Sequence, residues 1–221
     1  MLYRLEDARA NVRNRDGNRV FYLGKGDQLT SDARDWLSRE RIEILPAEKA
    51  KPERYRLLGG GYLEEKPEHM THLFGDVLVE KTHPRIAFRG AMDTLEAEIL
   101  LCALETPKWE KELQEVLQLA RMLLRCEVMG EKLPETPLGG LDAKALRERS
   151  HRPQDFYGQP HFMPAVADGA AVLRLNKVRC AVRRTELAAV AAMPDREDLL
   201  RALNRMSSFV YLLMIREKIN N

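Results

Sequence analysis

Beyond residue 85 the chain repeats apolar residues at three- and four-residue spacing over long stretches, the period of an amphipathic helix. In one stretch, Leu113, Val116, Leu117, Ala120 and Leu124 mark a single apolar stripe. The pattern predicts helices over residues 86–104, 108–129, 142–149, 169–192 and 196–218. Prolines and glycines between them indicate loops, the longest over residues 151–167. Long helices with no strand-like run between them favour a mainly α fold, an antiparallel bundle of about five helices.

The first 45 residues carry a different pattern, which is typical of short strands. Val20–Leu23 and Ile42–Leu45 are strand-like runs, and Leu29–Leu37 begins with the Thr, Ser and Asp residues that cap helices. Residues 46–67 are rich in Pro, Lys and Glu and include three consecutive glycines, a composition typical of a linker. We therefore expect a small α/β strand–helix–strand unit over residues 1–45, a linker over 46–67 and the bundle over 68–221.

The charge balance and the cysteine count exclude several classes of protein. Lys and Arg number 36 against 34 Asp and Glu, a net charge of +2, which argues against a dedicated nucleic-acid binder. Cys102, Cys126 and Cys180 form no C-x-x-C pair, so neither a disulfide framework nor a cysteine zinc site is predicted. The longest apolar run, Phe209–Ile215, is too short to span a bilayer, and residues 1–10 lack a secretory signal pattern. We expect a soluble cytoplasmic protein.

The helix predicted over residues 169–192 places charges beside its own apolar stripe. That stripe is formed by Leu175, Val178 and Val182. Arg179 and Glu186 lie within about 50–70° of its centre, and Arg183 lies on its flank. Residues 174–186 hold five cations against one anion. Because an unpaired inward charge is costly, a polyanionic ligand would complete such a site, and arginine suits phosphate oxygens.

Simpler explanations for these residues stay open. A basic helix stripe is often a solvated face, and Arg183 could form an ordinary pair with Glu186 one turn away. Asp93 could pair with Arg89 in the same way. Asn204 could cap or bridge helices instead of binding a ligand.

Three segments together resemble a known family. They are VEKTHPRIAFRGAMDTL at residues 79–95, RCAVRRTE at residues 179–186 and LNRMSS at residues 203–208. They occur in the order found in PduO-type ATP:cobalamin adenosyltransferases and are similar to the ethanolamine-utilisation (EutT-like) branch. The resemblance implies a PduO-type bundle that moves the 5′-deoxyadenosyl group of ATP onto reduced cobalamin, releasing triphosphate. Reduced cobalt is itself the nucleophile, so the protein must neutralise the triphosphate and hold the ribose in line.

The resemblance also implies roles for individual residues. Arg179 and Arg183 match family arginines near the phosphates, with Mg²⁺ expected on the polyphosphate. Glu186 and Asn204 match orienting groups beside them. Asp93 matches the family carboxylate that pairs with the first arginine, here Arg179.

Other positions match the family less completely. Phe162 matches an aromatic residue that lies against the lower face of cobalamin and displaces the lower ligand, which makes Co(II) easier to reduce. Its alternative role is to plug the end of the bundle. The family's amino-terminal phosphate loop is absent here, so Thr71, Lys81 and Arg184 are the remaining candidate nucleotide contacts.

No structural iron or zinc is expected. Many members of the ethanolamine branch carry a His and Cys cluster before this segment, but residues 54–66 contain neither residue type. His69 and His72 have a spacing that could ligate a metal on a helix, but two histidines without a third ligand are more often solvated.

Two functions from different classes fit these residues. The first is a corrinoid adenosyltransferase that supplies ethanolamine ammonia-lyase and works with a cobalamin reductase or a flavin reductant. It would be a homo-oligomer, with a trimer favoured over a dimer, located in the cytoplasm and within or attached to a bacterial microcompartment. The second is a non-catalytic carrier of nucleotide or cobalamin, or a microcompartment adaptor, as the missing phosphate loop suggests. Retention of the whole polar set favours catalysis; no nucleic-acid or membrane partner is expected.

Overall fold

The computed structural model describes residues 2–15, 17–46 and 54–220. The chain forms two compact units, residues 1–83 and residues 84–221. None of the helices in these described ranges is long and apolar enough to cross a membrane.

The amino-terminal part of the first unit is a small α/β arrangement, as the sequence predicts. Its elements are β1 (Leu2–Tyr3), α1 (Leu5–Asn11), β2 (Arg13–Arg15), β3 (Asn18–Leu23), β4 (Gln28–Leu29), α2 (Ser31–Arg39) and β5 (Glu43–Pro46). Strand β3 pairs in parallel with β5 and antiparallel with β2. The hydroxyl of Thr30 accepts a hydrogen bond from the Ala33 N–H at 3.4 Å, so the predicted capping chemistry starts α2.

The rest of the first unit is a four-stranded sheet, part of which lies where we expected a linker. Its strands are β6 (Tyr55–Leu57), β7 (Tyr62–Leu63), β8 (Met70–Phe74) and β9 (Val77–Glu80), in the order β7-β6-β9-β8. Residues 47–53 of the expected linker lie outside the described residues. Tyr55 packs with Met70 and Leu78, and Arg56 forms an ion pair with Asp76 at 3.2 Å. These contacts with residues some 20 positions ahead hold residues 55–63 in the sheet, and local composition does not reveal them.

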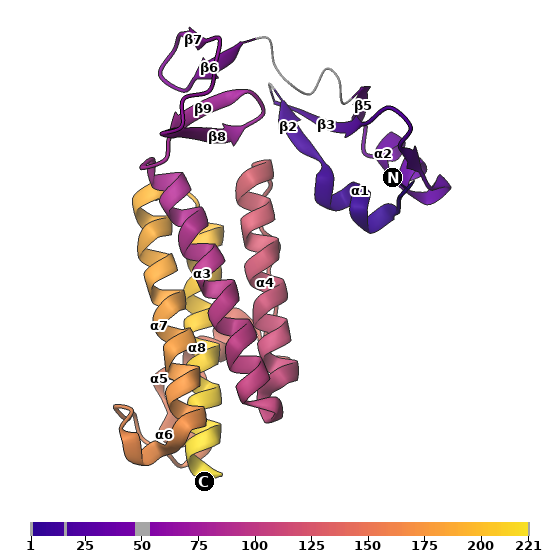
Figure 1. Cartoon of the computed structure of the whole chain (residues 1–221). Helices are drawn as coiled ribbons and strands as arrows, with labels where there is room; N and C mark the ends of the chain where they lie inside the picture. The colour runs from indigo at the N-terminus through magenta and orange to yellow at the C-terminus, as the bar shows by residue number, and fades with distance from the viewer. Residues whose placement is uncertain (1, 16, 47–53, 221) are drawn as a thin grey trace. The chain divides into compact units, whose positions relative to one another are not determined.

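The second unit is an antiparallel helical bundle, which confirms the predicted fold class (Figure 1). Its elements are α3 (Pro84–Glu105), the 3₁₀ turn η2 (Pro107–Trp109), α4 (Glu110–Met129), α5 (Ala143–His151), α6 (Pro153–Tyr157), the 3₁₀ turn η3 (Val166–Asp168), α7 (Gly169–Ala192) and α8 (Glu197–Ile219). Helix α3 begins at a proline, and α4 ends at Gly130 with φ 68°, so both termini follow ordinary helix chemistry. The expected loop over residues 151–167 contains the short helix α6, which Pro153 starts.

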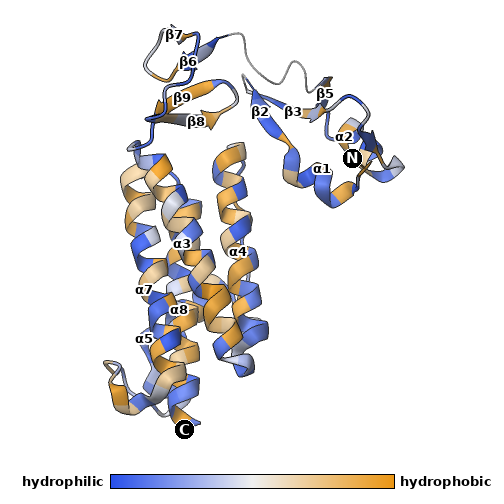
Figure 2. Ribbon diagram, viewed as in Figure 1, coloured by the Kyte–Doolittle hydropathy of each residue, from blue (hydrophilic) through white to orange (hydrophobic). Residues whose placement is uncertain are grey.

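The core of the bundle lies between the four long helices, α3, α4, α7 and α8, whose apolar faces turn toward one another (Figure 2). Completely buried members of the predicted stripes include Met92, Leu95, Leu113, Leu123, Leu175, Val178 and Val182, and Leu203 and Leu213 of α8 are buried with them. Truncating one such side chain to Ala typically costs about 2–5 kcal/mol. A tightly packed core therefore fixes the relative rotation of α7 and α8, and with it the residues on their polar edges.

Candidate functional site

One pocket of the bundle, with a volume of about 500 Å³, gathers several of the predicted site residues. It lies between α7, α8, the end of α5 and the segment that follows α6. Its lining residues are Ser150, His151, His161, Phe162, Met163, Arg179, Arg183, Asn204, Ser207, Ser208 and Tyr211. Among these residues none is Asp or Glu, whereas two are arginines. The pocket is therefore suited to an anion.

The two arginines project from α7 one turn apart and differ in how they are held. Arg179 is partly buried; its Nη1 donates to Asn176 Oδ1 at 3.3 Å, and its guanidinium lies 5.5 Å from the centre of the Tyr211 ring. Arg183 is exposed, and it forms no hydrogen bond or ion pair with any described residue. Neither arginine meets a carboxylate in the described ranges, so both keep their charge available to a ligand.

Asn204 lies at the centre of a short polar chain between α7 and α8. Its Nδ2 donates to Glu186 Oε1 at 3.1 Å, and its Oδ1 accepts from Arg205 Nη2 at 2.6 Å. Burial lowers the pKa of the Arg205 guanidinium. The two contacts fix the orientation of the Asn204 amide, with Nδ2 toward Glu186 and Oδ1 toward Arg205. Glu186 is thereby held by Asn204, and the alternative pair with Arg183 does not form.

Phe162 lies at the other side of the same pocket and packs partly against the bundle core. Its backbone N–H donates to the Tyr211 hydroxyl at 3.2 Å. The Lys218 ammonium lies 4.7 Å from the centre of the Phe162 ring and also forms an ion pair with Asp168, which lowers the pKa of that carboxyl. The segment that carries Phe162 is thus attached to α8 at two points.

The structure does not bring Asp93 to Arg179. Asp93 is exposed and has no hydrogen bond or ion pair within the described chain. Arg89 and Glu96, one turn before and after it, contact α4, which places Asp93 on the α4 side of α3. The expected Asp93–Arg179 pair is therefore absent within one chain, and so is the alternative pair with Arg89.

Other predicted site residues lie outside the pocket. Arg184 is exposed on α7 and does not line it. Thr71 belongs to β8 and Lys81 follows β9, both in the first unit, where Lys81 Nζ donates to Glu68 at 3.0 Å. His69 lies 3.7 Å from a carboxylate oxygen of Glu80. No group of three or more His, Cys, Asp or Glu side chains placed to hold a metal occurs in the described residues.

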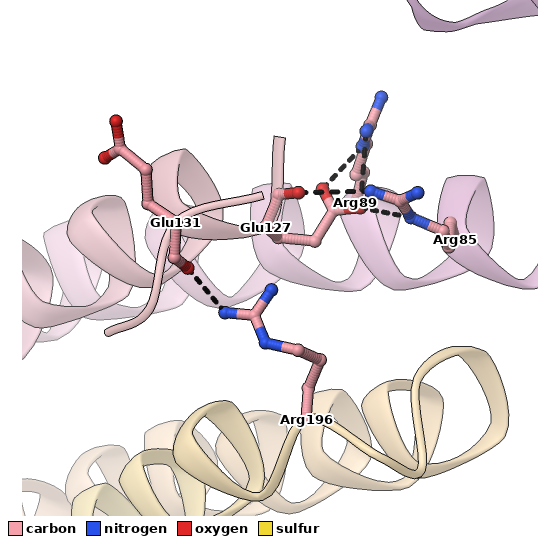
Figure 3. A network of polar contacts seen from close by, with 5 residues as sticks. All are labelled: Arg85, Arg89, Glu127, Glu131 and Arg196. Carbon is pink, nitrogen blue, oxygen red and sulfur yellow. Dashed lines mark hydrogen bonds and ion pairs between the residues drawn. The ribbon is translucent and has the colours of Figure 1, made fainter. Parts of the chain in front are cut away.

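A second arginine cluster, at the end of the bundle where α3 begins and α4 ends, differs from the pocket (Figure 3). Glu127, whose side chain is completely buried, accepts from Arg85 Nε at 2.6 Å and from Arg89 Nε at 2.9 Å. Nearby, Arg196 donates to the Glu131 carbonyl oxygen at 2.7 Å and pairs with Asp198, whose pKa this bond lowers strongly. These arginines have protein partners, so the cluster is structural.

A larger pocket, of about 740 Å³, lies between residues 132–143 and the first part of α8. Its lining residues include four carboxylates, Glu135, Asp142, Glu197 and Asp198. The carboxylates offset its three cations, so this pocket is less suited to a polyanion than the pocket of Arg179 and Arg183.

Two residues of consequence, Tyr211 and Glu127, are not among those predicted from the sequence. Tyr211 stands inside the apolar run Phe209–Ile215, but it is seven residues after Asn204, and this spacing places both on one face of α8. That spacing indicates that Tyr211 belongs to the same site as Asn204. Glu127 carries no local signal, because its two partners are 38 and 42 positions away in the sequence.

Comparison with known proteins identifies relatives of this chain. The sequence profile of the cobalamin adenosyltransferase family matches residues 61–217. The corrinoid adenosyltransferases EutT of Salmonella typhimurium and Escherichia coli are each 32% identical over 158 residues, or 68% of this chain. The match spans 59% of the length of those relatives. A variant PduO-type ATP:corrinoid adenosyltransferase from Lactobacillus reuteri, solved with cobalamin and ATP, superposes with a TM-score of 0.50 at 17% identity, covering 77% of this chain and 88% of that one.

Proposed function

The chain belongs to the cobalamin adenosyltransferase family, and we propose that it transfers the 5′-deoxyadenosyl group of ATP to reduced cobalamin, giving adenosylcobalamin and triphosphate. One observation carries the proposal: Arg179 and Arg183 face a pocket of about 500 Å³ whose lining includes no carboxylate among the described residues. A pocket of that size accommodates the triphosphate part of a nucleotide. The EutT relatives are corrinoid adenosyltransferases, which supports the proposed reaction class.

The charge of the pocket suits the leaving group of this reaction. When reduced cobalt attacks the ribose C5′, the bond from C5′ to the α-phosphate oxygen breaks, and negative charge collects on the triphosphate. Guanidinium groups fixed beforehand at that position stabilise this charge without reorganising. Arg179 is fixed by Asn176 and Tyr211, whereas Arg183 is free of protein partners in the described chain. In the proposal Arg179 is the preformed contact and Arg183 closes on the phosphates once they bind.

The neighbouring polar groups have orienting roles in the proposal. Asn204 holds Glu186 at the edge of the pocket, where this carboxylate could receive a Mg²⁺ ion that accompanies the triphosphate. Phe162 would meet the lower face of the corrin ring and exclude a lower ligand from cobalt. Arg184, Thr71 and Lys81 are secondary candidates for contacts to the nucleotide.

We also propose that the protein works as a homo-oligomer, with a trimer favoured over a dimer. Asp93 has no hydrogen bond or ion pair among the described residues, so in the proposal its family role of pairing with the first arginine falls to Arg179 of a neighbouring copy. Large apolar side chains are exposed near the carboxyl-terminal ends of α3 and α7, which supports contacts with another copy. They are Leu100, Leu101, Leu104, Leu187 and Val190.

We propose that this activity serves ethanolamine use, which the similarity to the EutT relatives supports. The product would then supply ethanolamine ammonia-lyase, with a cobalamin reductase or a flavin providing the electrons. A location in the cytoplasm, within or attached to a microcompartment, belongs to the same proposal.

An anaerobic absorbance assay tests the proposed function. Purified protein is mixed with ATP, Mg²⁺ and chemically reduced cobalamin, and the expected result is a protein-dependent spectrum of light-sensitive adenosylcobalamin. Tight binding of ATP or cobalamin without product would contradict the transferase and identify a carrier or adaptor. If neither binding nor product is observed, the chain keeps the family fold without its function.

A further inference from the structure

We infer that Tyr211 is a positioning residue that holds Phe162 in place and connects it to Arg179. The inference rests on the proposed function, which it deepens by naming the side chain that joins the corrin-facing and phosphate-facing parts of the pocket. Tyr211 projects from α8 into the pocket, and three of its neighbours there are His161, Phe162 and Arg179.

The hydroxyl of Tyr211 takes part in a chain of hydrogen bonds with a defined direction. His161 Nε2 lies 3.2 Å from the His151 carbonyl oxygen, which can only accept, so Nε2 carries the proton. In the neutral imidazole Nδ1 is then the acceptor, and the Tyr211 hydroxyl, 3.2 Å away, donates to it. A lone pair of the same hydroxyl remains to accept from the Phe162 N–H at 3.2 Å. Every group in this chain is satisfied in one arrangement.

The ring of Tyr211 makes a separate set of contacts. It stacks on the His161 ring at 5.7 Å and 12° and on the Phe162 ring at 6.0 Å and 26° between planes. The Arg179 guanidinium lies 5.5 Å from its centre, within the range of a cation–π contact. The hydroxyl therefore fixes the main chain of Phe162, and the ring contacts Arg179. One substitution can separate the two functions, because Tyr211→Phe removes the hydroxyl and keeps the ring.

The experiment compares Tyr211→Phe with the wild type in three measurements: ATP affinity, turnover, and the EPR spectrum of Co(II)cobalamin bound with ATP. An axial nitrogen ligand adds nitrogen splitting to that spectrum, so the spectrum reports whether Phe162 excludes the lower ligand. We expect turnover to fall about tenfold, the order of one or two lost hydrogen bonds, with ATP affinity changed less than about twofold. More of the bound Co(II) should keep its axial nitrogen. The matched control is Tyr157→Phe, which removes a hydroxyl with no hydrogen bond in the described chain.

A double-variant cycle distinguishes positioning from general destabilisation. If Tyr211 acts through Phe162, then Tyr211→Phe should have little further effect on turnover when Phe162 is already Ala. His161→Ala, a change on an exposed segment, should shift the EPR spectrum in the same direction because it removes the acceptor of the Tyr211 hydroxyl. Equal turnover and equal spectra for Tyr211→Phe and the wild type would overturn the inference. A wild-type protein that makes no adenosylcobalamin would instead overturn the proposed function.

Discussion

The bundle contains two arginine clusters that look alike in the sequence and differ in chemistry. Arg85 and Arg89 lie one turn apart on α3, as Arg179 and Arg183 do on α7. The first pair meets the buried carboxylate of Glu127 from α4 (Figure 3), whereas the second pair meets no carboxylate in the described chain and lines a pocket. The difference lies in what a distant segment supplies. A pair of arginines marks a ligand site only where the fold leaves it without an anion.

The largest expected effect comes from removing the anion of the first cluster. In Glu127→Ala, Arg85 and Arg89 lose their buried partner, and the free energy of unfolding should fall by about 3–5 kcal/mol. Chemical denaturation measured by circular dichroism checks this value. Glu135→Ala, which removes an exposed carboxylate paired at only 4.0 Å, is the control and should change stability by less than about 0.5 kcal/mol. A small loss for Glu127→Ala would remove the distinction between the clusters.

Substitutions in the second cluster, Arg179 and Arg183, should lower activity and not stability. Arg183→Ala should lower turnover by about 10²–10³-fold, the usual cost of one donor to a developing anion. It should leave the unfolding transition nearly unchanged because Arg183 has no partner among the residues that the structure describes. Steady-state kinetics and thermal unfolding measured on the same sample separate the two outcomes. Arg201→Ala, which removes an exposed arginine of α8 that pairs only at 3.8–4.0 Å with Glu197 and Glu135, is the control for loss of positive charge. Near-full activity of Arg183→Ala would show that the pocket is assigned wrongly.

A smaller effect, on pH dependence, sharpens the comparison further. The bond from Arg196 lowers the pKa of Asp198 below its unfolded value of about 3.9, so its contribution to stability is present above that pH and is lost as the pH falls through the folded pKa. Asp198→Asn should therefore cost about 1.5–3 kcal/mol at pH 7 and converge with the wild type in acid. Unfolding measured from pH 7 to pH 2 tests this expectation. If the free energies of unfolding of the variant and the wild type run parallel over this pH range, the Asp198 charge contributes nothing to stability.

Sequence periodicity predicted the bundle well because its helices are long and amphipathic. Helix α7 was predicted with the bounds that it has, Gly169–Ala192, and the strand–helix–strand start of the chain was also found. The pattern failed where structure depends on distant partners. Strands β6 and β7 are two or three residues long and are held by pairing with one another and with β9, and nothing in a composition of Pro, Lys and Glu indicates that pairing.

The candidate site was predicted in part for the same reason. Arg179, Arg183 and Asn204 come together because the register of α7 on α8 follows from the apolar stripes that the sequence displays. Asp93 does not join them, because it lies on the side of α3 where Arg89 and Glu96 contact α4. Tyr211 was overlooked because an aromatic residue within an apolar run resembles a core residue.

Helix α8 also sets the distances between the parts of the candidate site. Asn204, Tyr211 and Lys218 follow one another at intervals of seven residues, so they lie along one face about 10 Å apart. The first holds Glu186, the second meets Arg179 and Phe162, and the third lies over the Phe162 ring. One residue inserted between Asn204 and Lys218 would rotate all that follows by about 100° and separate the ends of the site. The site therefore constrains the length of this segment as well as the side chains at these three positions.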